Sequence, residues 1–273
     1  MTVEYQLRDA DFRKIANLVM SSAGIVVNER KKTFIQGRLG RRLRALGLSD
    51  FEEYCRLLDS PSGEEERHNL INAVTTNHTS FFREKHHFDY LQNAVLPAIA
   101  RDGTARRLRI WSAGCSTGEE PYTIAMVLRE CRALFPSWDA RILATDLDTN
   151  VLQRAADGVY DEERLEAVPA SYRKRYFVEA ADGFEVACDD LRSMISFGQL
   201  NLLEPWPMTG PFDIIFCRNV VIYFDKPTQR TLFDRYAEML KPDGWLFVGH
   251  SESLMGVSDR FELVGRTIYR RVR

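Results

Sequence analysis

Two glutamates stand where a glycine-rich turn leads into a predicted helix. The stretch RIWSAGCSTGEEPYTIAM, residues 109–126, predicts a short buried strand, a turn containing Gly114 and Gly118, and then a helix. Such a junction normally binds an anion, because its free amides and the helix dipole both favour negative charge. Here the turn is followed by Glu119 and Glu120, without the lysine that a phosphate-binding loop requires. These residue types therefore predict a ligand that bears positive charge.

Other polar residues directly follow later predicted strands. Asp146, within ATDLD, stands at the end of the second predicted strand. An acid roughly thirty residues past the glycine turn can accept both ribose hydroxyls of a nucleoside. Asn201 and Leu202 follow the next strand, and Arg218 and Asn219 follow the one after. Ligands of open α/β sheets bind at the carboxyl ends of the strands. Carboxylates and amides without a phosphate cradle suit S-adenosylmethionine, a nucleoside with a sulfonium and an ammonium.

The glycine turn also has an interpretation that needs no ligand. Glycines at a strand–helix junction can serve close packing alone, and the helix dipole favours Glu119 and Glu120 in a first turn even without a bound cation. The sequence leaves open which of the two glutamates contacts the ligand.

The elements that must position these residues alternate between strand and helix. The predicted strands are 108–113, 141–146, 194–198, 212–217, 244–249, 261–264 and 267–271, and the predicted helices are 119–133, 148–156 and 227–240. This alternation predicts an α/β fold with a mostly parallel sheet that is covered on both faces. The last two strands form a glycine-turned hairpin, and a shorter hairpin turns at Asp182 and Gly183.

The chain before residue 80 shows helical periodicity only. Apolar residues mark one face of a first and a second helix: Phe12, Ile15, Ala16 and Val19, then Ile35, Leu39, Leu43 and Leu46. A third helix starts at LSDFEEYCRLL and a fourth in SGEEERHNLINAV, and a long helix, EKHHFDYLQNAVLPAIA, follows residue 84. We therefore expect a small all-α domain over residues 1–80 and an α/β domain over residues 81–273.

Composition narrows the class of protein. With 273 residues, 45% of them hydrophobic, the chain can bury a substantial core, and its net charge of −2 argues against a surface that coats nucleic acid. No apolar run approaches the ~20 residues of a membrane span, and the N-terminus lacks the apolar core of a signal peptide. The five scattered cysteines indicate reduced thiols in a cytoplasmic protein.

No metal site is expected. The cysteines lack paired spacing, and the adjacent His86 and His87 would point about 100° apart on a helix with nothing to complete a site.

The sequence resembles the chemotaxis receptor methyltransferases, the CheR family, over essentially the whole chain. The most specific segments are TTNHTSFFRE (75–84), WSAGCSTGEEPY (111–122), ATDLD (144–148), NLLE (201–204), PFDIIFCRNVVIYFD (211–225) and LKPDGWLFVGHSE (240–252). The resemblance implies a Rossmann-like, S-adenosylmethionine-dependent methyltransferase sheet with a small inserted antiparallel β subdomain at about 165–195. It also implies that the N-terminal all-α domain precedes this sheet.

The resemblance further implies the reaction and its residues. Family members transfer the methyl group of S-adenosylmethionine to glutamate side chains of receptor cytoplasmic helices, which gives methyl esters and S-adenosylhomocysteine. The implied cofactor contacts are Asn77, Thr79, Arg83, Glu120, Asp146, Asn201, Leu202, Arg218 and Asn219. Arg83 and Tyr223 are implied to line the catalytic pocket.

Elementary chemistry agrees with this assignment. A glutamate side chain, with a pKa near 4.3, is already a carboxylate at neutral pH, so an in-line methyl transfer needs placement rather than a general base. Arg83 can hold a carboxylate through its planar fork, and Tyr223 can donate one more hydrogen bond. We expect Arg83 to orient the nucleophile. The alternative is a structural ion pair with a nearby acid such as Glu84.

Other functions remain to be weighed against this one. Amino-group methyltransferases use an Asn/Asp-Pro-Pro-aromatic loop, but residues 218–223 read RNVVIY, and no Pro-Cys nucleophile is present for carbon methylation. The alternatives are a methyltransferase for another protein or a nucleic acid, or a signalling module that binds the cofactor without catalysis. Transfer of label to a base-labile product separates them.

A basic helix carries the remaining functional signal. Arg38, Arg41 and Arg42 share one face of the second helix, opposite its leucines. A solvated face is the ordinary interpretation. Because receptor methylation helices are acidic, the three arginines also predict a receptor-binding surface. Nucleic acid is less favoured, since no platform of aromatic and basic residues accompanies the helix. We expect a monomer that does not insert into the membrane.

Overall fold

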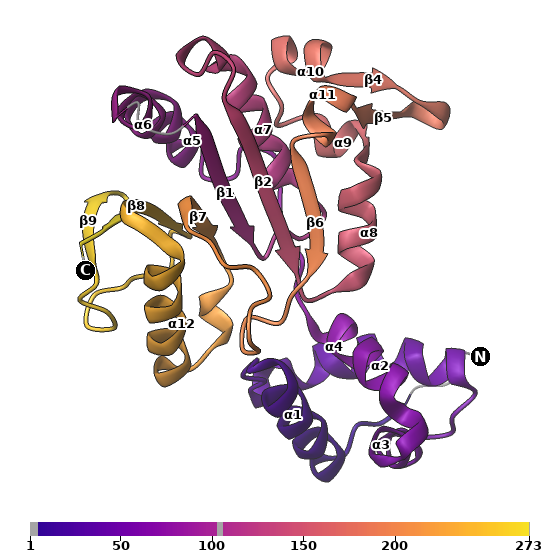
Figure 1. The fold of residues 1–273 in the computed structure, drawn as a ribbon. Coiled ribbons are helices and arrows are strands. Elements are labelled where there is room, and N and C mark those ends of the chain that lie inside the picture. The colour runs from indigo at the N-terminus through magenta and orange to yellow at the C-terminus, as the bar shows by residue number, and fades with distance from the viewer. Residues whose placement is uncertain (1–4, 103–105, 273) are drawn as a thin grey trace. The chain divides into compact units, whose positions relative to one another are not determined.

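A seven-stranded sheet organises the larger of two units in the computed structural model, which describes residues 5–102 and 106–272 (Figure 1). Across the sheet the strands are β6 (Ile195–Gln199), β2 (Asp139–Asp146), β1 (Arg107–Ala113), β7 (Phe212–Cys217), β8 (Leu240–Val248), β10 (Ile268–Arg271) and β9 (Phe261–Gly265). The first five are parallel, and β10 pairs antiparallel with β8 and β9. The predicted strands and closing hairpin are confirmed, but β8 begins four residues earlier than predicted. The hairpin turns at Arg266 and Thr267, and Gly265 is the last residue of β9 rather than part of the turn.

The order of the strands reverses at β1, the first strand in the chain. Its neighbours are β2 on one side and β7 on the other. Ligands of open α/β sheets bind beyond the carboxyl ends of the strands at such a reversal. All six residues of β7 are buried, which is typical of a central parallel strand that is covered on both faces. The loops after β1, β2 and β7 therefore start from buried strands. They lie at the carboxyl edge of the sheet, where a ligand is expected.

Five helices of the larger unit correspond to the predicted helical segments. They are α5 (His86–Tyr90), α6 (Leu96–Asp102), α7 (Glu119–Glu130), α8 (Thr149–Asp157) and α12 (Lys226–Met239). A π-helical turn, Leu91–Val95, joins α5 to α6, so the long helix predicted after residue 84 is present with one irregular turn. Short 3₁₀ turns lie at Arg132–Leu134 and Val221–Tyr223. Residues 119–128 of α7 are all buried, so this helix is part of the core.

A second, three-stranded antiparallel sheet lies within the larger unit. Its order is β3 (Val159–Asp161), β5 (Phe184–Ala187) and β4 (Phe177–Glu179), accompanied by α9 (Glu162–Leu165), α10 (Ala170–Tyr176) and α11 (Asp189–Arg192). As predicted, the hairpin β4–β5 turns through Asp182 and Gly183. Their φ angles are 59° and 77°. The small sheet starts with β3, a few residues before the predicted limit of about 165.

The smaller unit runs to Thr76 and includes Tyr223–Asp225. Its α-helices are α1 (Asp9–Ala23), α2 (Lys32–Leu46), α3 (Phe51–Asp59) and α4 (Glu64–Val74), with 3₁₀ turns at Glu29–Lys31 and Pro61–Gly63. Asp50 caps α3 by accepting a 2.8 Å hydrogen bond from the amide of Glu53, and the Glu53 carboxylate accepts one from the amide of Ser49 at 2.9 Å. This reciprocal pair explains why the third helix begins where the sequence predicts.

The buried faces of α1 and α2 are those predicted, with two exceptions: Ala16 is only half-buried, and Leu46 is exposed. Ile35, Leu39 and Leu43 are buried, whereas Leu46 is 39% exposed. The prediction for Leu46 is wrong because α2 ends at this residue, where Gly47 turns into the left-handed region with φ 67°. In the described part of the chain, no helix is both long and apolar enough to cross a membrane.

Candidate functional site

The glycine turn after β1 packs against its own chain. Gly114 and Gly118 have φ angles of 91° and 98°, in the region that glycine favours. A Cβ on Gly114 would lie 2.3 Å from Cγ2 of Val220, and one on Gly118 would lie 2.7 Å from the hydroxyl of Tyr160. Close packing, the interpretation that needs no ligand, therefore accounts for both glycines. It also fixes the turn against the loop that follows β7.

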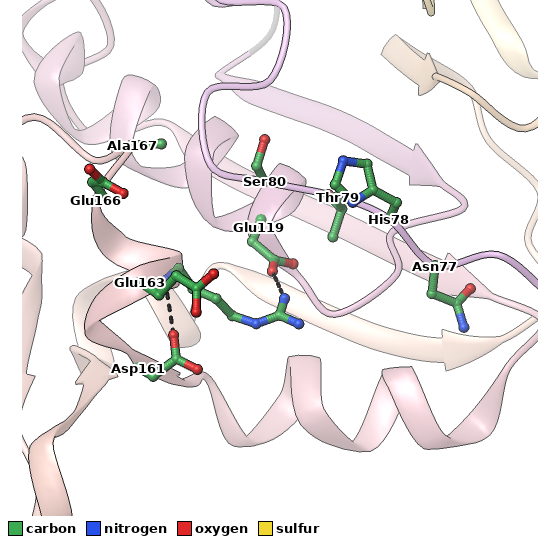
Figure 2. A pocket seen from close by; sticks show the side chains of 10 residues that line it. Asn77, His78, Thr79, Ser80, Glu119, Asp161, Glu163, Glu166 and Ala167 are labelled. Atoms are coloured by element: carbon green, nitrogen blue, oxygen red, sulfur yellow. Dashed lines mark hydrogen bonds and ion pairs between the residues drawn. The ribbon is translucent and has the colours of Figure 1, made fainter.

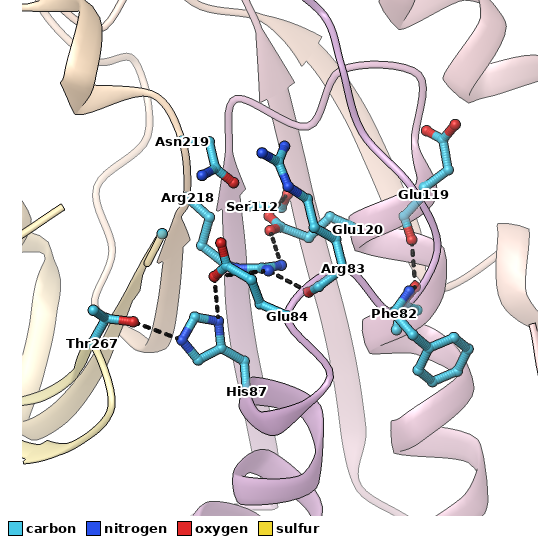
Figure 3. Close-up of polar contacts among 12 residues, drawn as sticks. Phe82, Arg83, Glu84, His87, Ser112, Glu119, Glu120, Arg218, Asn219 and Thr267 are labelled. Carbon is cyan, nitrogen blue, oxygen red and sulfur yellow. Dashed lines mark hydrogen bonds and ion pairs between the residues drawn. The ribbon is translucent and has the colours of Figure 1, made fainter. Parts of the chain in front are cut away.

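Glu120 is held from two sides in the larger unit. Its Oε1 accepts a 2.6 Å hydrogen bond from the hydroxyl of Ser112, and its Oε2 accepts one from Nη1 of Arg218 at 3.0 Å (Figure 3). Both Glu120 and Arg218 are buried. The cation that faces Glu120 in this structure is thus an arginine of the same chain.

Arg218 also contacts the segment that contains Arg83 and Glu84 (Figure 3). Its Nη2 donates to the carbonyl oxygen of Arg83 and lies 3.3 Å from Oε2 of Glu84. Its guanidinium carbon lies 5.4 Å from the ring centroid of Phe88, a cation–π distance. Arg218 was predicted as a cofactor contact. The structure gives it an additional role, because it links Glu120 to the backbone of Arg83.

Glu119 has different partners. It is 1% exposed, accepts a 2.7 Å hydrogen bond from the hydroxyl of Thr117 and forms an ion pair with Arg164. It lies at a cavity of about 560 Å³ (Figure 2). The lining residues are Asn77, His78, Thr79, Ser80, Glu119, Asp161, Glu163, Arg164, Glu166 and Ala167. Two predicted cofactor contacts, Asn77 and Thr79, therefore share this cavity.

Asp146, the predicted ribose acid, lies at the tip of β2. Its Oδ2 accepts a 2.8 Å hydrogen bond from the amide of Ser116, and its Oδ1 accepts one from the amide of Asp148 at 3.0 Å. Burial raises the pKa of the Asp146 carboxyl, against the opposing effect of these amides. Each carboxylate oxygen can accept a second hydrogen bond. Asp146 can therefore join two loops and still accept hydrogen bonds from a ribose.

Asn77 is brought to the same place by two hydrogen bonds. Its Nδ2 donates to Oδ2 of Asp148 at 2.7 Å, and its carbonyl oxygen accepts a bond from the hydroxyl of Ser116 at 3.0 Å. The segment before α5 is thereby attached to the loops after β1 and β2. The structure thus assembles Asn77 with the surroundings of Asp146, although the two residues are far apart in sequence.

Arg83 is not paired with Glu84. Its Nη1 donates to the carbonyl oxygen of His78 at 2.7 Å, and within residues 5–102 and 106–272 it forms no ion pair with an acid. Glu84 instead contacts Arg218, His87 and His250. The alternative interpretation of Arg83, a structural ion pair with Glu84, is therefore wrong. The guanidinium retains donors for a ligand.

Glu84 and His87 have strongly shifted pKa values. Burial by itself would raise the pKa of Glu84, but the hydrogen bond from His250 and the charge of Arg218 lower it to about 2. Burial and the positive charge of Arg218 lower the pKa of His87 to about 3, so its ring is neutral at pH 7. Nε2 of His87 lies 3.0 Å from the hydroxyl oxygen of Thr267 (Figure 3). In the described residues no group of three or more His, Cys, Asp and Glu is arranged for a metal ion.

The remaining predicted cofactor residues lie in the loops after β6 and β7. Asn201 donates to Oε1 of Glu204 at 3.1 Å, and the carbonyl oxygen of the buried Leu202 accepts a bond from Arg235 at 2.5 Å. Asn219 has a φ of 60°, and its amide donates to Glu252 at 2.8 Å. No ligand contact of Asn201, Leu202 or Asn219 is tested by this structure, so these assignments stay predictions.

Several residues of the site were missed by the sequence analysis. Glu252 receives hydrogen bonds from backbone amides of the β7 loop, Glu84 contacts Arg218, and Arg164 pairs with Glu119. The available signal for Glu252 was its place in the loop after a buried strand, four residues past β8, whereas Asp146 is the last residue of its own strand. Glu84 and Arg164 carried no such signal, because their partners are distant in the sequence.

Tyr223 groups with the smaller unit. It ends the turn Val221–Tyr223, and its carbonyl oxygen accepts a 2.9 Å hydrogen bond from the amide of Val26. Nζ of Lys31 lies 5.1 Å from its ring centroid. Its predicted role beside Arg83 stays a prediction.

The predicted receptor-binding arginines of α2 differ in their surroundings. Arg42 forms a two-point ion pair with the buried Glu66, with Nε 3.0 Å from Oε1. Arg38 donates to the carbonyl oxygen of Ala73 at 3.0 Å, near the end of α4. Arg41 is exposed. Arg38 and Arg42 therefore hold α4 as well as carrying charge, and Arg41 faces solvent.

The strand order and the residues at the strand tips define a nucleoside-binding α/β domain. Comparison with known proteins gives its family. The model of the CheR methyltransferase SAM binding domain matches residues 77–270, and that of the CheR methyltransferase all-alpha domain matches residues 10–75. The chain belongs to the CheR methyltransferase family. The predicted family, fold class and S-adenosylmethionine-dependent methyltransferase activity are thereby confirmed.

Named relatives match over nearly their whole length. A probable chemotaxis protein methyltransferase of Rhizobium etli is 44% identical over 93% of this chain and 96% of its own. The chemotaxis protein methyltransferase of Escherichia coli is 43% identical over 98% of this chain and 93% of its own. Chemotaxis protein methyltransferase 2 of Pseudomonas aeruginosa is 43% identical over 97% and 94%.

The buried His87 predicts a specific loss of stability in acid. Its pKa is lowered in the folded state, so the unfolded state binds the proton more tightly, and stability is lost as pH falls from about 6.5 toward 3. Between about pH 7 and 5, above the range in which Glu84 titrates, His87 contributes a slope of at most about 1.4 kcal/mol per pH unit. Replacement His87→Gln should flatten the pH dependence of urea unfolding in this range.

All four tryptophans belong to the larger unit, so tryptophan fluorescence reports its unfolding alone. The matched control is His68→Gln, because His68 is exposed on α4 of the smaller unit. If the free energy of unfolding changed equally with pH in wild type and His87→Gln, the lowered pKa of His87 would be contradicted.

Proposed function

We propose that this protein transfers the methyl group of S-adenosylmethionine to glutamate side chains of chemoreceptor cytoplasmic helices, forming the methyl esters used in chemotaxis adaptation. Its relatives are named chemotaxis protein methyltransferases. The observation that carries the proposal is the linkage of the loops after β1, β2 and β7 through Asp146, Glu120 and Arg218. A cytoplasmic location follows from the proposed substrate.

The donor set fits the cofactor. Asp146 keeps acceptor capacity for ribose hydroxyls, and the two carboxylates Glu84 and Glu120 exceed the single positive charge of Arg218, which suits a cationic ligand. The proposed contacts are Asn77, Thr79, Arg83, Glu120, Asp146, Asn201, Leu202, Arg218 and Asn219. When bound, S-adenosylmethionine supplies a methyl group on a sulfonium. No metal is needed for this chemistry.

The chain's own residues orient the nucleophile. A receptor glutamate arrives as a carboxylate, so the protein must place one oxygen in line and partly remove its water. Arg83, whose backbone is fixed by Arg218, would hold the other oxygen through its planar guanidinium. Tyr223 would donate one hydrogen bond to the same carboxylate.

The ribose assignment can be tested with Asp146→Asn. The variant loses the negative charge that strengthens hydrogen bonds from the ribose, each worth about 1.5–3 kcal/mol. We expect the affinity for S-adenosylhomocysteine, measured by calorimetry, to fall by about tenfold or more. Asp139→Asn, at the opposite end of β2, is the matched control and should bind normally. Unchanged affinity in Asp146→Asn would remove Asp146 from the cofactor site.

The role of Arg83 can be tested with Arg83→Lys. With methyl-labelled cofactor and receptor signalling domains, the wild type should produce base-labile label, as expected of methyl esters. The lysine keeps the charge but loses the planar fork, and a misplacement of about 1 Å costs on the order of a hundredfold in rate. We expect most single-turnover transfer to be lost, with cofactor affinity within about tenfold of wild type.

Tyr223→Phe provides a graded comparison, since one neutral hydrogen bond is worth about 0.5–1.5 kcal/mol and its loss should be milder. Near-normal transfer by Arg83→Lys would show that the guanidinium is not the carboxylate clamp. Base-stable label, or label in nucleic acid, would favour the other methyltransferase classes.

We further propose that α2 binds the receptor through Arg38, Arg41 and Arg42, with Arg41 as its exposed charge. Charge complementarity to acidic receptor helices supports this surface. Reversal of Arg42 would place a like charge beside the buried Glu66, so a test of binding should avoid it.

The receptor surface can be tested with Arg41→Glu. An exposed charge at the border of an interface, such as Arg41, acts mainly on the rate of association. In the variant the receptor KM should therefore rise and its salt dependence should weaken, while cofactor affinity stays unchanged. Arg132→Glu, an exposed arginine of the larger unit, makes the same change in net charge and is the control. Equal receptor KM values for the two variants would leave α2 as a solvated face.

A further inference from the structure

A buried carboxylate outside the predicted site lies in the loop after β8. Glu252 is 4% exposed and accepts hydrogen bonds from four backbone amides. Its Oε2 accepts from Gly249 at 2.5 Å and from Asn219 at 2.8 Å, and its Oε1 accepts from Val220 at 2.9 Å and from Ile222 at 3.3 Å. One side chain therefore holds three amides of the loop after β7 and one amide of its own loop.

These amides are what stabilise the charge of Glu252. Within the described residues it forms no ion pair, and a carboxylate has about four acceptor positions, which the four amides use. Burial raises the pKa of the Glu252 carboxyl, and the four amides oppose that effect. A buried carboxylate with all its acceptor positions occupied is costly to disturb.

The held loop has an unusual backbone conformation. Asn219 has a φ of 60°, in the left-handed region that asparagine adopts more readily than other non-glycine residues. A Cβ on Gly249 would lie 2.5 Å from Nδ2 and 2.8 Å from the backbone nitrogen of Asn219. The loop is therefore fixed from two sides, by the carboxylate of Glu252 and by the close approach of Gly249.

This loop begins with Arg218 and Asn219, two of the proposed cofactor contacts. Arg218 in turn holds Glu120 and the backbone of Arg83. A shift of the amides at positions 219–222 would move these groups together. Val220 also packs where a Cβ on Gly114 would stand, so the glycine turn depends on the same loop.

We propose that Glu252 is a positioning residue of the methyltransferase site, whose carboxylate sets the loop after β7 and thereby orients Arg218 and Asn219 toward the cofactor. The proposal rests on the proposed cofactor roles of those two residues. Because four backbone amides occupy its carboxylate, Glu252 would act through the loop and not by contact with cofactor or substrate.

The isosteric variant Glu252→Gln tests the proposal. Its amide nitrogen replaces one acceptor oxygen, so two backbone N–H groups would face a donor. We expect the KM for S-adenosylmethionine to rise by about tenfold or more, and the affinity for S-adenosylhomocysteine to fall equally, because small displacements of contacting groups have large effects. The receptor KM should not change.

The matched control is Asp213→Asn. Asp213 is a buried carboxylate at the start of the same strand, β7, and it accepts a 2.8 Å hydrogen bond from the amide of Arg109. A purely structural defect lowers the fraction of active enzyme and therefore kcat, with the cofactor KM unchanged, and this is the result expected for Asp213→Asn. The same result for Glu252→Gln would overturn the proposal.

Gly249→Ala gives a second route to the same loop with Glu252 intact. The added methyl must displace Asn219, so the cofactor KM should rise as in Glu252→Gln. This variant tests whether the position of the loop sets cofactor binding, even if Glu252→Gln does not fold. An unchanged KM in Gly249→Ala would also count against the proposal. Failure of the wild type to bind S-adenosylhomocysteine would instead contradict the proposed function.

Discussion

The buried guanidinium of Arg218 is the interaction on which the rest of the site depends. Its charge lies between the carboxylates of Glu84 and Glu120, and it also donates to the backbone of Arg83. Removing one partner of such a cluster leaves an uncompensated buried charge, which is far costlier than losing a surface ion pair. Three segments that are distant in the sequence are therefore held in one arrangement by a single side chain.

The same cluster reconciles the two interpretations of the glycine turn. Its glutamates were expected to face a cation, and in this structure they face Arg218 and Arg164. Around Arg218, however, two carboxylates oppose one guanidinium, and the neutral His87 adds no positive charge. Apart from the contact of Glu84 with His250, the buried surroundings of Glu120 thus hold one carboxylate more than Arg218 pairs with, which suits a positively charged ligand.

The sequence predicted the fold well because the two signals it offers, the spacing of apolar residues and the polar residues at strand ends, are both local. Continuous apolar runs such as β7 and the helical spacing of α1 reflect burial of neighbouring residues, and residues just past strands identified Asp146 and Arg218. Glu252 escaped prediction because its partners are backbone amides, which every residue carries. Arg42 appeared to be a free surface charge, since nothing local indicates that Glu66 is buried beside it.

Carboxylates connect three of the four neighbouring pairs of parallel strands at the carboxyl edge of the sheet. Asp146 joins the loops after β2 and β1, Glu120 with Arg218 joins those after β1 and β7, and Glu252 joins those after β7 and β8. A reaction that needs no general base depends mainly on placement, and loops alone hold placement poorly. Charged hydrogen bonds between adjacent loops supply the missing rigidity. Asp146 and Glu252 fix backbone amides, and Glu120 fixes the buried side chain of Arg218. The carboxylates therefore hold the loops beyond the strand ends in fixed positions relative to the sheet.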